Sequence, residues 1–110
     1  MSQEELYRLL TESGLPVCRD WTDTSMPLQL PHLVMFVSRD RPLGGDLCRL
    51  ADWHLVRLEL YSRRVDLAAE RQVRQVLDRA GISYTLDRVP IPEQSLHEAI
   101  FEFEIIEVQE

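Results

Sequence analysis

Zinc-binding residue types occur at five positions in this sequence, but without the spacing that builds a metal site. These ligands are Cys18, His32, Cys48, His54 and His97. Structural zinc sites usually hold ligands in pairs about two to five residues apart, because short spacing orients them before the metal binds. Joining such separated residues would cost loop-closure entropy. We therefore expect no metal site, and we expect both cysteines to be thiols in a reducing compartment.

Sequence signatures of catalysis are missing as well. The chain has no glycine-rich nucleotide motif, no Walker loop, no nucleophile elbow and no His-Glu-x-x-His motif. Gly44 and Gly45 lie in a turn-like stretch at residues 42–46 that lacks the lysine and the following helix of a phosphate-binding loop. We expect no catalytic residues, no cofactor and no enzyme activity.

A row of carboxylates lies near the C-terminus. Glu98, Glu102 and Glu104 share one face of an expected strand, because alternate residues of a strand point the same way. Such a row is either a solvated face or an acidic lining along which another polyanion passes without binding. The chain carries 19 acidic and 12 basic residues, a net charge of −7, which disfavours binding to duplex DNA.

Residues 39–52 combine charges of both signs with apolar and glycine residues. The basic members are Arg39, Arg41 and Arg49, the acidic members are Asp40, Asp46 and Asp52, and the apolar members include Leu43 and Leu47. A two-residue turn could join the flanking strands, so the extra length predicts a loop with its own role. Alternating charges suit contacts between identical neighbours in a ring. The alternative is a mobile hairpin tip with no role.

A second long loop is expected at residues 14–31, where prolines recur and periodicity is weak. Trp21 and Met26 lie inside it. They are either core residues or exposed anchors for a partner surface.

Hydrophobic periodicity predicts the elements that position these residues. The expected helices are 3–13, which begins with a Ser2–Glu5 capping box, and 66–80, capped by Asp66. The expected strands are 32–38, 47–50, 53–61, 82–88 and 96–108. The order α-β-β-β-α-β-β predicts one α+β domain over residues 1–110, a mostly antiparallel sheet with both helices on one face.

The same patterns predict which side chains are buried. The expected core includes Leu6, Leu10, Leu58, Val73, Leu77, Phe101 and Phe103. On the strand at 53–61, His54 should face the core side, while Glu59 points the other way. Glu70 belongs to the charged face of the second helix, which we expect to be solvated. The sequence has no membrane-spanning run and no apolar leader at residues 1–5, so we expect a cytoplasmic protein.

Several segments taken in order resemble one known family. They are residues 14–17 (GLPV), 31–37, 45–46, 57–61 (RLELY) followed by Asp66, 82–84 (ISY) and 95–104 (SLHEAIFEFE). The ordered set is similar to the small tail-completion, or tail-terminator-like, proteins of long-tailed bacteriophages and prophages.

The resemblance implies a virion structural protein that acts in tail completion or head–tail joining. Its copies would close into a ring, commonly a hexamer, on the head-proximal end of the tail tube. The implied partners are the major tail tube protein and the head connector, with no sequence-specific nucleic acid and no membrane. It would act in the host cytoplasm during assembly and then in the virion. Under this hypothesis the interface residues are Trp21, Arg39, Arg41, Leu43, Asp46 and Arg49, and the lumen residues are Glu98, Glu102 and Glu104. The alternative is a small cytoplasmic ligand-binding or regulatory domain unrelated to phage, since fold does not determine function.

Overall fold

The computed structural model describes residues 1–19, 29–45 and 48–108, apart from the side chains of residues 48 and 49. The elements are α1 (Gln3–Thr11), β1 (Val17–Arg19), β2 (His32–Gly45), β3 (Cys48–Ser62), α2 (Leu67–Arg79), β4 (Thr85–Ile91), a 3₁₀ turn η1 (Pro92–Gln94) and β5 (Leu96–Val108). Their order roughly fits the predicted α-β-β-β-α-β-β, although β1 was not predicted and two predicted strands are both part of β3.

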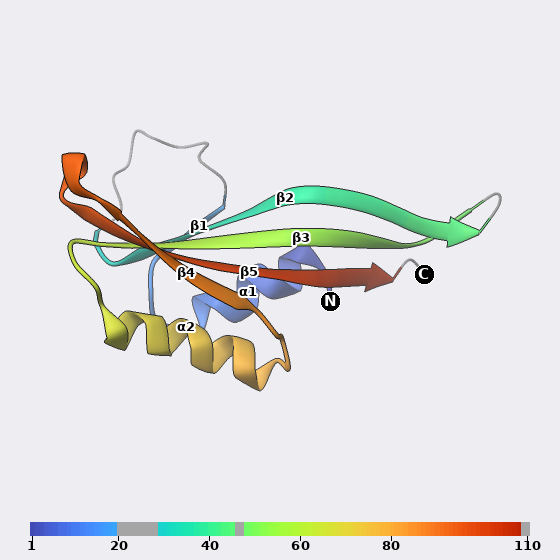
Figure 1. The fold of residues 1–110 in the computed structure, drawn as a ribbon. Coiled ribbons are helices and arrows are strands. Elements are labelled where there is room, and N and C mark those ends of the chain that lie inside the picture. Colours follow the sequence, from blue (N-terminus) through green and yellow to red (C-terminus); the bar gives the residue numbers. More distant parts are fainter. Residues whose placement is uncertain (20–28, 46–47, 109–110) are drawn as a thin grey trace.

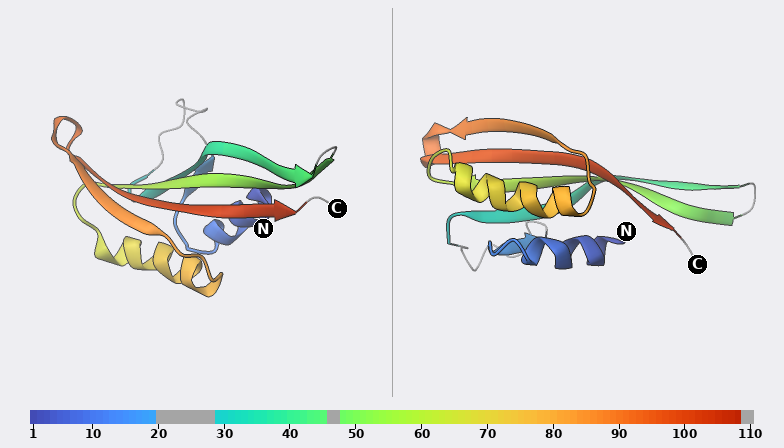
Figure 2. Two further views of the ribbon diagram at one scale, coloured as in Figure 1. Left: turned by 45° about the vertical axis from the view of Figure 1, so that its right-hand side comes forward. Right: turned by 90° about the horizontal axis from the view of Figure 1, so that it is seen from below.

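The strands form one sheet that both helices cover on the same face. The strand order is β1-β2-β3-β5-β4. Only the short β1–β2 pair is parallel, and the other neighbours are antiparallel. Figures 1 and 2 show α1 and α2 side by side beneath the sheet. The predicted α+β class, with a mostly antiparallel sheet and two helices on one face, is confirmed.

The core lies between this sheet face and the two helices. All seven side chains expected there are buried: Leu6, Leu10, Leu58, Val73, Leu77, Phe101 and Phe103. Phe101 lies at the centre of the sheet, opposite Leu58 on β3 and Leu86 on β4. Its ring also contacts Tyr84 edge-on, with centroids 5.6 Å apart. The alternating apolar side chains of β3 and β5 therefore form the part of the core that the sheet contributes.

Both helices begin at the predicted caps. The Ser2 hydroxyl accepts a hydrogen bond from the Glu5 N–H at 3.0 Å. The Asp66 carboxylate accepts from the Ala69 N–H, also at 3.0 Å. Helix α1 ends at Thr11, slightly before the predicted end, and Gly14 follows in the left-handed region at φ 85°. Such a φ favours glycine, because it has no Cβ.

The prediction of a loop at residues 39–52 is wrong. Strand β2 continues to Gly45 and β3 begins at Cys48, so residues 39–45 and 48–52 form the outer part of a long antiparallel strand pair. The strands predicted at 47–50 and 53–61 are one strand. Turn-forming residue types are tolerated here because β2 has β3 on one side only, so the missing N–H of Pro42 interrupts no inner ladder.

Two further boundaries differ from the expectations. The strand predicted at 82–88 is β4, Thr85–Ile91, which continues through Pro90 because β4 is the outermost strand of the sheet. The loop predicted at 14–31 contains β1, which pairs over Val17–Arg19 with β2. Met26 lies outside the described residues.

Candidate functional site: the open face of the sheet and its arm

The sheet face opposite α1 and α2 is called the open face here. Strand register assigns to it Arg57, Glu59 and Tyr61 of β3 and Glu98, Ile100, Glu102 and Glu104 of β5. The predicted row Glu98, Glu102 and Glu104 therefore does share one face. Glu104 is exposed and Glu102 is partly exposed.

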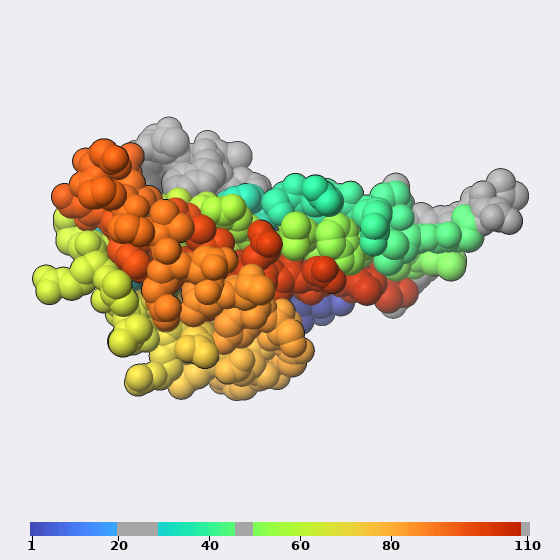
Figure 3. Space-filling view, in the orientation of Figure 1, coloured from blue at the N-terminus to red at the C-terminus, as the bar shows by residue number. Residues whose placement is uncertain are grey.

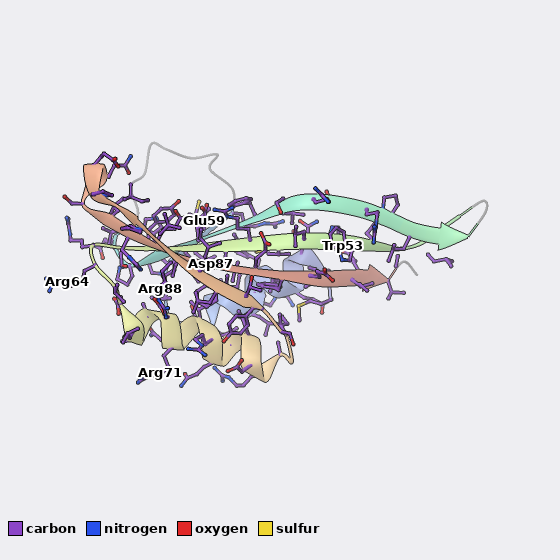
Figure 4. All side chains as sticks on the ribbon, in the orientation of Figure 1. Trp53, Glu59, Arg64, Arg71, Asp87 and Arg88 are labelled. Carbon is purple, nitrogen blue, oxygen red and sulfur yellow. The ribbon has the colours of Figure 1, made fainter. Side chains whose placement is uncertain are left out.

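A polar cluster lies on this open face where β3 pairs with β5. We call Arg57, Glu59, Tyr61 and Glu98 the open-face cluster. Tyr61 is directly opposite Glu98 in the register. The Arg57 guanidinium lies 3.4 Å from a Glu59 oxygen and 3.8 Å from a Glu98 oxygen. Figure 4 shows Glu59 on the sheet and Arg88 on the side of α2.

Glu98 fits neither alternative stated for the carboxylate row, because its side chain is buried. Its residue exposure is only 7%, and that of Glu59 is 6%. The alternation of the strand correctly predicts that the Glu98 side chain points away from the helices. Its burial depends on long side chains of the neighbouring strand, which periodicity does not reveal. Burial is the main cause that raises the pKa of Glu98, and the hydrogen bond and charge of Glu59 act in the same direction. Arg57 opposes them, and the resulting pKa is about 7.

The pKa of Tyr61 is also raised, first by burial and then by the charges of Glu59 and Glu98. Burial lowers the pKa of His32, whose ring centroid lies 5.5 Å from that of Tyr61. These shifts all favour the neutral form of each group. The cluster therefore exchanges one proton near neutral pH through Glu98.

Glu98→Gln is expected to flatten the dependence of stability on pH. The folded chain binds the Glu98 proton more tightly than the unfolded chain, whose carboxyl has a pKa of about 4.5. The associated stability is present below that value and is lost as pH rises through about 7. We expect wild type to lose about 1–2 kcal/mol more than the variant across this window, after allowance for solvent screening. Urea unfolding at several pH values measures this difference in stability.

The control is Glu104→Gln, which changes an exposed carboxylate on the same face and strand. It should retain the wild-type pH profile. Parallel profiles for wild type and Glu98→Gln would show that Glu98 titrates at its ordinary pKa.

The open face extends into a projecting arm. We define the arm as residues 39–45 of β2, 48–55 of β3 and 103–108 of β5. Figure 3 shows these strands extending beyond the part of the molecule that α2 covers. The molecule is accordingly elongated, with extents of 50 × 30 × 21 Å.

Side-chain contacts join the neighbouring strands of the arm. The Arg41 guanidinium lies over the Trp53 ring, 5.1 Å from its centroid, on the open face. On the other face, His54 Nδ1 hydrogen-bonds Asp40 Oδ1 at 2.5 Å, and its Nε2 lies 3.7 Å from Glu107. His54 is buried on the core side, as predicted, but the sequence did not reveal that Asp40 and Glu107 flank it. Only strand register brings these three residues together.

The structure brings together some of the expected interface residues. Arg39 and Arg41 are exposed on β2, and Leu43 is half-buried on the same strand. Arg49 lies on β3, but its side chain is not among those described. Trp21 and Asp46 lie outside the described residues. The interface role of all six stays a prediction.

The prediction of a solvated Glu70 is wrong. Its side chain is only 3% exposed, and Arg88 of β4 binds it with two hydrogen bonds, of 2.6 and 3.0 Å. Helical periodicity placed Glu70 away from the apolar stripe, but β4 passes over that side of α2. The ion pair ties the outermost strand to the helix and has no evident functional role.

A hollow of about 570 Å³ lies where β4 begins. It is lined by Leu55, residues 81–85 and residues 102–104. The hollow therefore adjoins the arm at the point where β5 loses β4 as its neighbour.

Residues 1–19, 29–45 and 48–108 hold neither a metal-ligand cluster nor a membrane-spanning helix. Among them, no group of three or more His, Cys, Asp or Glu side chains is placed to hold a metal ion. Within the same ranges, no helix has both the length and the apolar character needed to cross a membrane. The three histidines lie on three different strands.

Comparison with known proteins does not identify this α+β domain with its projecting arm. No protein-family model matches the chain. No curated protein matches it either.

Proposed function

We propose that this chain is a structural subunit that completes the tail of a long-tailed phage or prophage. Copies of it would close into a ring at the head-proximal end of the tail tube, stop tube growth and provide a docking surface for the head connector. The observation that carries the proposal is the arm, an extension of the sheet that lies beyond the helices and displays charged residues. The ordered motifs of the sequence support the same function.

The open face suits the passage of DNA. Glu102 and Glu104 lie on it in a row. Carboxylates repel phosphates, so DNA would pass such a face without adhering. In this proposal the open face lines the ring's channel.

A second candidate is a small ligand-binding or regulatory domain. The observation that favours it is the hollow beside Tyr84 and Glu104. A gene neighbourhood with major tail protein and capsid genes supports the first function, whereas a neighbourhood without them supports the second.

Deletion of the gene from an inducible phage or prophage tests the first function. We expect over-long, headless tails in the lysate and restoration of uniform, infectious particles by the gene supplied in trans. Uniform tails in the deletion strain would remove the tail-completion function. The control is a Glu93→Gln gene, which alters an exposed carboxylate of η1 at the end of the sheet opposite the arm and should complement fully.

A further inference from the structure

Two edges of the arm lack a neighbouring strand in the described part of the chain. On β2, the partner β1 covers only Leu33, Val34 and Met35, and the strand then continues to Gly45. On β5, the partner β4 reaches only to Glu102, and the strand then continues to Val108. Unpaired backbone groups along such edges are a template for another strand.

Each edge leaves only a short stretch of strand available for pairing with another strand. Pro42 has no N–H and ends the usable part of the β2 edge. On β5, the amino group of Met1 donates to the Ile106 carbonyl at 2.9 Å, so the open stretch is residues 103–105. This length matches β1, which joins the outer edge of β2 by a parallel pairing of three residues.

The two edges carry opposite charge on the same face. Arg39 and Arg41 line the β2 edge of the open face, because they lie opposite Leu55 and Trp53. Glu102 and Glu104 line the β5 edge of that face. The exposed apolar side chains Ile106 and Val108 continue the β5 edge. A basic edge and an acidic edge complement one another.

We propose that the β2 edge of one copy pairs with the β5 edge of a second copy through this charge-complementary contact. Both strands are antiparallel to β3, so β2 and β5 run in the same direction and the joint is a parallel pair. Each added copy leaves one edge of each kind open, so the contact is head-to-tail, the type that forms a ring when the rotation between copies closes. Two copies joined by identical edges would instead oppose arginine to arginine or glutamate to glutamate.

The hollow fits this arrangement. A register that sets Arg39 beside Glu104 brings Phe36 of the same strand toward Glu102, where the hollow lies. The hollow therefore lies beside the end of the joint at which the incoming strand meets β4. The inference deepens the proposed function and rests on it for the choice of a second copy as partner. A joint this short also suits a subunit that stays monomeric until a tube gathers its copies.

Disulfide trapping between two single-cysteine variants tests the pairing. Arg39→Cys and Glu104→Cys are made separately in a Cys18→Ser, Cys48→Ser background, and unfolding by urea confirms that each folds as its background does. Within one copy, Arg39 and Glu104 lie on either side of Leu55, two strand spacings or about 10 Å apart, which is too far for a disulfide. Only two different copies can form the bond.

Mild oxidation is carried out on each variant alone and on their equimolar mixture, both in concentrated solution and on tail tubes. We expect disulfide dimers in the mixture and little or none in either variant alone. Dimers of a single variant would show pairing of identical edges and overturn the inference. Absence of dimers in the mixture, in solution and on capped tubes alike, would also overturn it.

The same samples separate this inference from the proposed function. Dimers in the mixture together with unchanged tube length would retain the edge pairing and remove tail completion. Capped tubes without dimers would retain tail completion and remove the pairing. As a charge test, Arg39→Glu with Arg41→Glu should abolish cross-linking between separately introduced cysteines at Leu43 and Val108, which the same register sets side by side. Glu102→Arg with Glu104→Arg in the second copy should restore it.

Discussion

Phe101→Ala is expected to lower the free energy of unfolding by about 3–5 kcal/mol, the range for truncating a buried phenylalanine. The side chain has no exposure, and its neighbours on β3 and β4, Leu58 and Leu86, cannot fill the space without moving the sheet. The edge-on contact with Tyr84 is lost as well. Chemical denaturation at equilibrium measures the change.

Ile106→Ala is the matched control for this prediction. Ile106 lies on the same strand but is 49% exposed on the opposite face, so its truncation should cost less than about 1 kcal/mol. Equal losses for the two variants would contradict the assignment of the strand faces.

Arg88→Ala is expected to destabilise the chain by about 2–4 kcal/mol. The change leaves the Glu70 carboxylate, only 3% exposed, without its cation. Removing one partner of a buried ion pair costs more than the pair contributes, because an uncompensated charge remains. The value lies below the full range for buried pairs, because Arg88 itself is 42% exposed and water can enter after its truncation.

Glu70→Gln in the Arg88→Ala background should recover much of this loss, since it removes the buried charge. A matched control is Arg19→Ala, which breaks an exposed pair with Glu4 and should cost less than about 1 kcal/mol. If the double variant were less stable than Arg88→Ala alone, the buried charge would not be the cause.

Local signals in the sequence were sufficient for the helices and for the last strand. Ser2 and Asp66 are capping residues, and their effect is confined to one helical turn. The alternation of residues 96–108 coincides with β5, Leu96–Val108, because one of its faces is continuously apolar. The core could therefore be predicted residue by residue.

The arm could not be predicted because its stability comes from residues distant in sequence. Pro42 and Gly44 favour a turn locally, but the pairs Arg41–Trp53 and Asp40–His54 extend the ladder through them. The burial of Glu70 has the same origin, because Arg88 arrives from a strand outside the helix. Local propensity is overruled where long-range pairing supplies the partners.

Part of the candidate site followed from the sequence and part did not. The charges of Arg39 and Arg41 drew attention to the correct segment, although the structure makes it strand rather than loop. The carboxylate row of β5 was predicted as a face, but only the register shows that it lies across β3 from those arginines. The charge complementarity between the β2 edge and the β5 edge can therefore be recognised only in the folded sheet.

The most direct measurement of the central claim is the length of tail tubes assembled in vitro. Tubes are grown from the purified major tail protein encoded in the same gene cluster, with this chain absent or added in increasing amounts, and their lengths are measured by electron microscopy. The account predicts that growth stops when the chain is added, with a ring of it at one end of each tube. An identical length distribution at every amount of the chain, with bare tube ends, would contradict it.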